Sequence, residues 1–359
     1  MKNNRKRYYG LYFCLMLMVV FIVGCNNSAP NGGTAPVKEP KSDSFFVFDT
    51  IVSIRIYDDK ATEKNFQEIK ELTHVIDTQI SRNLDTSEIS KVNQAAGKAA
   101  VHVSDKTFYV VQKALMYSEL SKGQFDLTIG PLVSLWGIGN EGAHVPTKPD
   151  LDAALTKINY KDVLLDESKK EIKLAKEGME IDLGAIGKGY AADEIADYLL
   201  KNNFNSAIID LGGNIFALGV KPDGSQWNIG IQDPKEERGN QIGKMKVNNK
   251  TIVTSGIYER FFVENGVHYH HILSPQTGYP VNNNLSSVSI VTDKSIDADG
   301  LSTSVFALGL EEGKKFVDGL DNVEAIFVTA DQKVYITDGL KGNFDLTNEM
   351  YQLCEFSNN

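Results

Sequence analysis

The sequence predicts a single α/β or α+β domain, built on a mixed or antiparallel sheet with flanking helices, over residues 45–359. Stretches with the two-residue alternation of strands are mixed with stretches that have the helical period of 3.6 residues. Many strand-like stretches are neighbours along the chain, which favours antiparallel pairs. The composition, with 42% apolar and 23% charged residues, is that of a globular protein.

The N-terminus is predicted to be a targeting segment outside this domain. A basic stretch precedes an apolar run over 11–23, which is shorter than the roughly 20 residues of a membrane span. The run ends at Gly24-Cys25 and resembles a bacterial lipobox; an uncleaved anchor helix is the alternative. We therefore expect a lipoprotein signal peptide over residues 1–24 and a lipid anchor such as palmitate on Cys25. Residues 25–44 are rich in Pro, Gly, Ser and Asn and are expected to form a flexible tether.

The charge of the chain argues against nucleic acid as its main partner. The net charge is −10, and the first 24 residues contain four cations and no acid, so the remainder is more acidic still. A nucleotide ligand is compatible with this charge, because a metal ion and backbone N–H groups can bind its phosphates.

The first part of the domain is predicted to contain one strand and three helices. Residues 45–57 alternate apolar and polar side chains in their second half, which predicts a strand with one buried face. Among the helix starts, Asp85 with Glu88 is a capping signature, and Ser104 caps the third helix. The helical ranges are 60–80, 86–95 and 104–123.

Residues 124–137 predict a strand-like piece, interrupted by Gly130 and Pro131, and then a short helix. Trp136 in this segment is interpreted as a core residue, with stacking on a ligand ring as the alternative. The rest of the chain predicts further strands and one more helix besides those discussed below. The strands cover 163–166, 171–174, 206–211, 215–220, 227–232, 251–255, 285–291, 323–329 and 333–336, and the helix covers 311–320.

A glycine-rich bend over 181–190 joins a predicted strand to a predicted helix over 191–200. A strand, a glycine bend and a helix N-terminus form a natural anion site, although the spacing matches neither the Walker nor the dinucleotide motif. The bend is interpreted either as a phosphate site that includes Lys188 or as a tight turn with Lys188 in solvent.

Three histidines lie within four positions, at His268, His270 and His271. In a strand the first two share one face, and His271 points to the other. No Cys residue and no HExxH motif accompanies them, which disfavours zinc. His271 precedes a Gly/Pro loop, where functional groups tend to collect, and is the candidate general base or phosphate contact.

Residues 295–310 carry the candidate metal site. Asp299 and Thr303 are four residues apart at the head of a predicted helix and so lie on one helix face. A carboxylate and a hydroxyl that point the same way are hard oxygen ligands, which Mg²⁺ takes alongside water and substrate phosphate. The alternative is an ordinary helix start, in which Asp297 or Asp299 caps free N–H groups.

Eight stretches together resemble the ApbE family, the FAD:protein FMN transferases, which are usually exported lipoproteins. The resemblance runs from Phe45 to the C-terminus. The stretches are FDTIVSIRIY (48–57), SEIS (87–90), FDLTIGPLVSLWG (125–137), IDLGAIGKGYAAD (181–193), IDLGGN (209–214), TSGIYERFF (254–262), HHILSPQTGYPV (270–281) and DADGLSTSVFALG (297–309).

The resemblance implies a lipid-anchored flavin transferase on the extracytoplasmic face of the cell membrane. Such an enzyme binds FAD with Mg²⁺, cleaves the pyrophosphate, attaches FMN to a Ser or Thr hydroxyl of an extracytoplasmic acceptor protein and releases AMP. The implied catalytic residues are His271, a base whose ordinary pKa of about 6.5 suits neutral pH, and Asp299. The implied metal ligands are Asp299, Thr303 and the backbone carbonyl of Ala185. The implied cofactor-binding residues are Asn83, Gln124, Phe125, Asp126, Asp182, Lys188 and Ile272.

Two positions depart from the family pattern. The family usually has Asp where this chain has Ser274, and many members have Tyr where this chain has Asn83. A Tyr can stack on a flavin and an Asn cannot, so water can compete better as acceptor. An FAD pyrophosphatase that yields FMN and AMP is therefore the alternative enzyme, and an FAD-binding lipoprotein is the alternative without catalysis.

We predict that Cys25→Ala leaves catalysis by the purified protein unchanged but releases the protein from the membrane, because the thiol that carries the lipid is lost. Cell fractionation and an activity assay of the soluble extract measure both effects. A variant that stays in the membrane fraction would contradict the lipobox interpretation.

Overall fold

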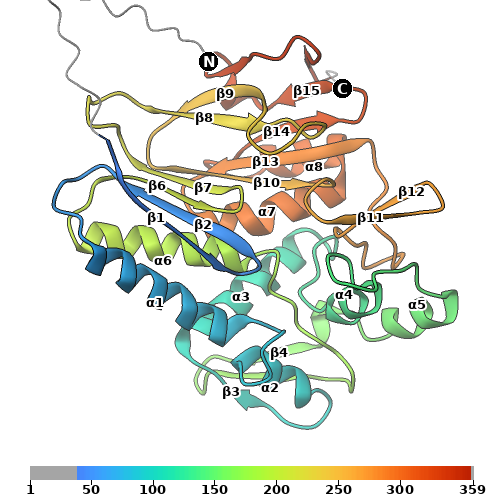
Figure 1. The fold of residues 1–359 in the computed structure, drawn as a ribbon. Coiled ribbons are helices and arrows are strands. Elements are labelled where there is room, and N and C mark those ends of the chain that lie inside the picture. Colours follow the sequence, from blue (N-terminus) through green and yellow to red (C-terminus); the bar gives the residue numbers. More distant parts are fainter. Residues whose placement is uncertain (1–38, 357–359) are drawn as a thin grey trace, which may run out of the picture. The chain divides into compact units, whose positions relative to one another are not determined.

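A computed structural model of the protein describes residues 39–356, and the predicted signal peptide and Cys25 lie outside these residues. Its centre is a nine-stranded sheet (Figure 1). In spatial order the strands are β1 (Lys41–Val47), β2 (Thr50–Ile56), β6 (Ser206–Leu211), β7 (Asn214–Gly219), β10 (Lys250–Gly256), β13 (Leu285–Thr292), β14 (Glu324–Thr329), β15 (Lys333–Ile336) and β17 (Gln352–Cys354). Every neighbouring pair is antiparallel except β15 and β17, which confirms a mostly antiparallel sheet.

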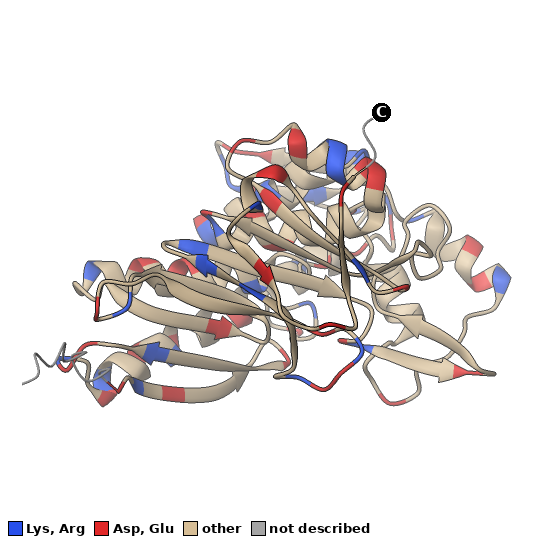
Figure 2. Cartoon of the chain, turned by 90° about the horizontal axis from the view of Figure 1, so that it is seen from above, with Lys and Arg blue, Asp and Glu red and all other residues tan. Residues whose placement is uncertain are grey.

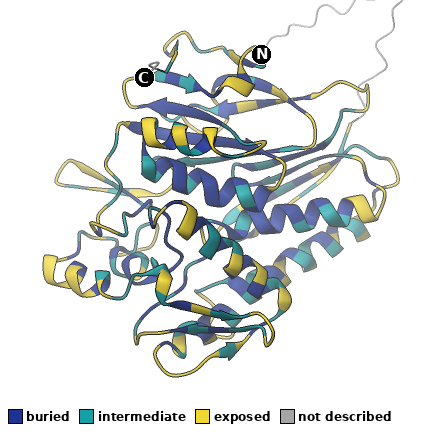
Figure 3. Cartoon of the chain, turned by 180° about the vertical axis from the view of Figure 1, so that it is seen from behind, coloured by how far each residue is buried: buried dark blue, intermediate teal, exposed yellow. Residues whose placement is uncertain are grey.

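Helices cover one face of this sheet (Figure 1). They are α1 (Glu63–Ile80), α6 (Gly187–Lys201), α7 (Ser295–Leu308) and α8 (Leu310–Asp318). The apolar residues Phe66, Ile69, Ile76 and Ile80 of α1 are buried, whereas Val75 is exposed. Helix α7 is buried along most of its length (Figure 3), so its side chains are held by packing from several sides.

A three-stranded sheet covers part of the opposite face. It consists of β16 (Phe344–Leu346), β9 (Gln241–Val247) and β8 (Trp227–Gln232). Its apolar side chains, with Trp227 and Met245 among them, form a second core with Ile252 and Val291 of the large sheet. Strands β1, β2 and β6 contribute no fully buried residue to this second core.

In Figure 1 most of the remaining elements lie below the helical layer, and the β11–β12 hairpin lies to the right. They are α2 (Glu88–Gln94), β3 (Val101–His102), α3 (Asp105–Leu120), α4 (Gly130–Trp136), α5 (Lys148–Leu155), the 3₁₀ turn η1 (Tyr160–Asp162), β4 (Val163–Asp166), β5 (Glu171–Leu174), β11 (Phe261–Glu264) and β12 (Val267–His270). A second 3₁₀ turn, η2 (Asp338–Leu340), precedes β16. Trp136 is fully buried, and its Nε1–H donates to the Gly278 carbonyl at 2.7 Å, which confirms the core interpretation.

The strand predicted over 45–57 is instead a hairpin. Phe48 and Asp49 both have a φ of +54°, which a tight two-residue hairpin turn requires. Strand β1 begins at Lys41, inside the predicted tether, so the boundary at residue 44 was wrong. Pairing with β2 orders these polar residues through backbone hydrogen bonds, which composition does not reveal.

Three further local predictions were wrong. Residues 124–129 and 181–183 form no strand; a single bridge joins Ile129 to Glu180, and the Asp182 N–H donates to the Leu127 carbonyl at 2.8 Å. Helix α6 begins at Gly187, four residues earlier than predicted, and α2 is capped by Ser87 rather than Asp85. Elements β3, α5, β9, β16 and β17 were not predicted. Within residues 39–356, no helix is both long enough and apolar enough to cross a membrane.

We predict that Gly189→Ala lowers the free energy of unfolding by about 2 kcal/mol or more. The added Cβ would lie 2.2 Å from the Ser295 carbonyl oxygen and 2.8 Å from the Asp299 Cβ, where α6 and α7 touch. Urea unfolding measures the loss. The control is Gly319→Ala, whose Cβ meets no atom closer than 3.5 Å; equal stability of the two variants would contradict the close packing of α6 on α7.

Candidate active site

The glycine bend and the candidate metal pair meet where α6 begins. The N–H of Gly189 donates to Asp299 Oδ2 at 2.9 Å, and the Lys188 Nζ lies 3.6 Å from Asp299 Oδ1. The Asp299 side chain is buried, and only a glycine leaves room for this approach. The sequence predicted a site from two segments over 100 residues apart, and the structure brings those segments into direct contact.

The donor set at this contact suits a hard divalent cation. Asp299 Oδ2 accepts the Gly189 N–H, while Oδ1 faces the Lys188 ammonium group. Thr303, one turn further along α7, is half-buried, and its Oγ1 lies 3.4 Å from Ser255 Oγ. Ala185 lies in the turn just before α6. One carboxylate, one hydroxyl and one carbonyl are oxygen ligands of the type that Mg²⁺ takes.

The start of α7 is capped from α6, not from its own acids. Asp193 accepts hydrogen bonds from the N–H groups of Ser295 (2.9 Å) and Ile296 (3.0 Å). Burial raises the pKa of Asp193 to about 6. Asp297 pairs with Lys113 at 2.8 Å, so the alternative that Asp297 or Asp299 caps the helix was wrong. Sequence analysis missed Asp193, whose only signal was its place at the end of the IDLGAIGKGYAAD stretch.

His271 lies beside a backbone carbonyl that fixes its tautomer. Its Nδ1 is 3.2 Å from the Arg260 carbonyl oxygen, which also accepts the His271 backbone N–H at 3.1 Å. A carbonyl only accepts, so Nδ1 carries the proton and Nε2 keeps a free lone pair. Burial lowers the pKa of His271 to about 4, and the positive charge of Arg260 and Lys188 acts in the same direction. The imidazole is therefore neutral at pH 7. Its pKa lies below the ordinary value of about 6.5 that was expected from the sequence.

The other two histidines are structural. His270 is buried, with Nε2 3.0 Å from the Val281 carbonyl and Nδ1 accepting the Ile272 N–H at 3.3 Å. His268 stacks on Phe261, with ring centroids 4.2 Å apart. Over residues 39–356, no three His, Cys, Asp or Glu side chains are grouped so that they could hold a metal.

Several implied cofactor-binding residues brace the loops around the site. Asp126 accepts hydrogen bonds from the Thr128 N–H (2.8 Å) and Oγ1 (2.7 Å) and from the Tyr160 N–H (3.0 Å), and burial raises its pKa. Phe125 and Ile272 are also buried, whereas Gln124 is half-buried. Any contact of Phe125 or Ile272 with a ligand would therefore be made largely by backbone atoms.

The glycine bend is held by an arginine that sequence analysis missed. The Asp182 Oδ1 accepts the Gly184 N–H at 2.7 Å, and its Oδ2 lies 3.4 Å from Arg82, which also pairs with Glu180 at 2.8 Å. Asn83, next to Arg82, is exposed. No motif marked Arg82, because its partners lie about 100 residues along the chain.

Ser274 forms a turn at the position where the family resemblance led us to expect an Asp. Its Oγ accepts the N–H groups of Gln276 (3.3 Å) and Thr277 (3.2 Å), as a carboxylate oxygen would. Gln276 in turn donates from Nε2 to the Gly123 carbonyl at 2.7 Å. The loop after His271 is thus tied to the loop that carries Gln124 without the charge of an acid.

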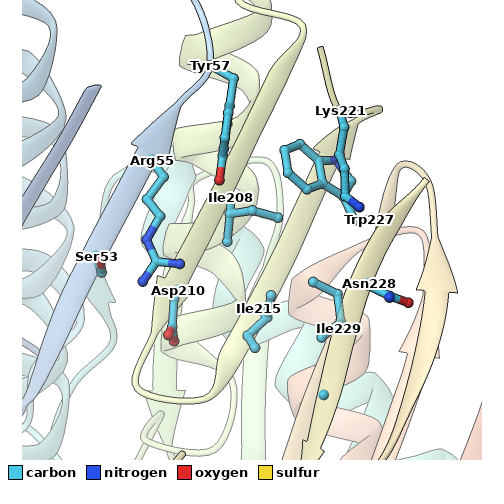
Figure 4. Close-up of a pocket in the computed structure, with 11 residues that line it drawn as sticks. Ser53, Arg55, Tyr57, Ile208, Asp210, Ile215, Lys221, Trp227, Asn228 and Ile229 are labelled. Atoms are coloured by element: carbon cyan, nitrogen blue, oxygen red, sulfur yellow. The ribbon is translucent and has the colours of Figure 1, made fainter. Parts of the chain in front are cut away.

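A cavity of about 320 Å³ lies on the other face of the large sheet, between β2, β6, β7 and β8. Figure 4 shows Arg55 extending toward Asp210 and Lys221 beside Trp227 in this cavity. None of the predicted site residues lines it. Charged residues of both signs are interspersed over the elements seen in Figure 2.

Comparison with known proteins places these features in one family. The ApbE family model matches residues 48–327. The chain is 36% identical to an FAD:protein FMN transferase of Klebsiella pneumoniae over 85% of this chain and 93% of that protein, and 35% identical to one of Treponema pallidum over 92% and 94%. The structure is similar to the ApbE protein from Thermotoga maritima (TM-score 0.79, 30% identity, 85% of this chain and 99% of that one). It is also similar to the flavin transferase ApbE from Vibrio cholerae (TM-score 0.76, 28% identity, 85% and 99%).

We predict that the His271 imidazole titrates at about pH 4, because burial and nearby cations disfavour its charged form. NMR titration of ¹⁵N-histidine-labelled protein measures this value, and a His271→Gln variant assigns the signal. A midpoint near the ordinary 6.5 would show that the ring is solvated.

Proposed function

The chain belongs to the ApbE family, and from this premise we propose that it is an FAD:protein FMN transferase. A Ser or Thr hydroxyl oxygen of an acceptor protein attacks the FMN phosphorus of FAD, and a P–O phosphoester bond forms. The bond from that phosphorus to the bridging oxygen breaks, AMP leaves with that oxygen, and the hydroxyl proton passes to a base. The observation that carries the proposal is the hydrogen bond from Gly189 to Asp299, which joins a helix N-terminus to a candidate metal ligand.

We propose that Mg²⁺ binds to Asp299, Thr303 and the Ala185 carbonyl. When bound there, the ion would neutralise charge on the pyrophosphate oxygens. The support is the donor set, because all three donors are hard oxygens and Asp299 has one oxygen that Gly189 does not occupy.

The residues of the chain have separate tasks in this reaction. At the start of α6 the N–H groups of Gly187 and Gly189 are already bonded, to the Leu183 carbonyl and to Asp299, so Lys188, 3.6 Å from Asp299, would supply the positive charge near the phosphates. His271 offers a neutral Nε2 to the acceptor hydroxyl, oriented by the Arg260 carbonyl. Phosphoryl transfer depends mainly on positioning and charge neutralisation, so a base of low pKa is compatible with it.

Hydrolysis of FAD by water is the competing reaction, and exposed Asn83 is the observation that favours it. An Asn at the rim offers no ring to stack on the isoalloxazine, so the flavin would be less shielded from water. The acceptor dependence of FAD loss distinguishes the two reactions.

We further propose that the lipid on Cys25 anchors the chain to the extracytoplasmic face of the cell membrane. This proposal is supported by the basic stretch, the short apolar run and the lipobox-like Gly24-Cys25. It places the acceptor protein outside the cytoplasm.

The test is mass spectrometry of extracytoplasmic proteins after incubation with the purified protein, FAD and Mg²⁺. We expect a Ser- or Thr-containing peptide that has gained FMN, and about a hundredfold slower transfer by Asp299→Asn and Asp299→Ala. Asp299→Asn keeps an oxygen acceptor for the Gly189 N–H, so its loss of activity reports charge rather than folding.

The matched control is Asp293→Ala, which removes an exposed carboxylate that pairs with Lys250 just before α7. Its transfer rate should equal that of the wild type. Rapid loss of FAD with no flavin attached to any protein would identify the hydrolase instead, and wild-type activity of Asp299→Ala would refute the metal assignment.

A further inference from the structure

The hairpin of β11 and β12 presents an exposed apolar face. Opposed residues of an antiparallel pair share a face, and the register pairs Phe261 with His270 and Val263 with His268. The side chains of Phe261 and Val263 are 46% and 60% exposed. Rings continue along this face, because Phe261 stacks on His268 and His270 lies against Phe306 of α7 at 6.0 Å. The exposed face thus begins at the tip of the hairpin and ends at the helix that carries Asp299.

The opposite face of the hairpin is already packed. Phe262 and Tyr269 stack with centroids 5.3 Å apart and lie 6.3 Å and 5.4 Å from the ring of Trp136. Near the tip, Glu264 accepts the Val145 N–H at 3.3 Å. The hairpin is therefore fixed to the α4 region, and its exposed face is free for another partner.

The edge of β11 is also free in the part of the chain that the structure describes. In an antiparallel pair of strands, hydrogen-bonded residue pairs alternate with non-hydrogen-bonded ones. The bond from the His271 N–H to the Arg260 carbonyl shows that Arg260 and His271 are a hydrogen-bonded pair. It follows that the backbone N–H and C=O groups of Phe261 and Val263 point away from β12. Over residues 39–356, β11 pairs only with β12. A free apolar edge is a template for another strand, which proteins normally protect.

The hairpin connects directly to the candidate active site at both ends. His271 follows the last residue of β12. The segment before β11 comes from β10, where Ser255 Oγ lies 3.4 Å from Thr303 Oγ1. A chain laid along β11 would therefore lead from solvent toward His271 and Thr303.

We propose that β11 is the docking strand for the acceptor protein. An extended segment of the acceptor pairs with the free edge of β11 as a third strand, and its apolar side chains lie on Phe261 and Val263. Its Ser or Thr hydroxyl is thereby delivered to His271. This inference rests on the proposed function, because it is that reaction which requires a protein segment here. Main-chain pairing supplies affinity, and the apolar contacts supply selectivity for a segment with apolar residues at alternate positions.

The test uses Val263→Pro and Phe261→Ser with the acceptor that mass spectrometry identifies. Proline at 263 removes an N–H that points outward, so the bonds of the hairpin itself are kept. We expect the KM for the acceptor to rise about tenfold in each variant, while the KM and Kd for FAD stay at wild-type values. Unchanged FAD binding shows that the site is intact.

Two variants serve as matched controls. Val263→Thr keeps the outward N–H, and Leu164→Ser removes a 52% exposed apolar side chain from β4, far along the chain from the hairpin. Leu164→Ser should keep the wild-type KM for the acceptor, and Val263→Thr, which replaces one methyl group by a hydroxyl, should raise it less than Val263→Pro. A wild-type KM in Val263→Pro and Phe261→Ser would overturn the docking strand, as would a dimer seen by ultracentrifugation that Val263→Pro disrupts without a change in KM. Absence of FMN transfer by the wild type would instead refute the proposed function itself.

Discussion

The direct contact between α6 and α7 at Gly189 is the constraint on which the rest of the site depends. Because residue 189 has no side chain, its N–H reaches the Asp299 carboxylate at 2.9 Å, and the Ser295 carbonyl fills the space that a Cβ would need. Four residues later, Asp193 caps the start of α7. One helix therefore fixes both the position and the start of the other, and the side chains of Asp299 and Thr303 have little freedom to move.

Buried polar groups around this contact fix the orientation of α7 on the large sheet. Ser295 Oγ donates to Asn214 Oδ1 at 2.6 Å and accepts from Thr251 Oγ1 at 3.0 Å, so the large sheet is hydrogen-bonded to the same end of α7. Such a network costs desolvation, and its bonds favour a single arrangement, although the buried Asn214 Nδ2 has no hydrogen-bond partner among the described residues. Separately, burial keeps His271, which follows β12, neutral at pH 7.

The sequence predicted those parts of the fold that local patterns determine. The period of two gave the buried face of β2, and the i to i+4 spacing gave Asp299 and Thr303. The proximity of the glycine bend to α7 came from the family resemblance, since no local pattern links segments that far apart. The capping of α7 by Asp193 and the pairing of Arg82 with Glu180 are long-range contacts without a local signal. Residues 41–44 of β1 were placed in the tether because these polar residues are ordered by pairing with β2 alone.

Diffraction from crystals grown with FAD and Mn²⁺ tests the central claim most directly, because Mn²⁺ occupies oxygen sites of the Mg²⁺ type and has an anomalous signal. The account predicts one or more anomalous peaks within coordination distance of Asp299, Thr303 and the Ala185 carbonyl, with the FAD pyrophosphate against the start of α6. Manganese bound only elsewhere, or FAD bound away from Gly189 with no metal at Asp299, would contradict it.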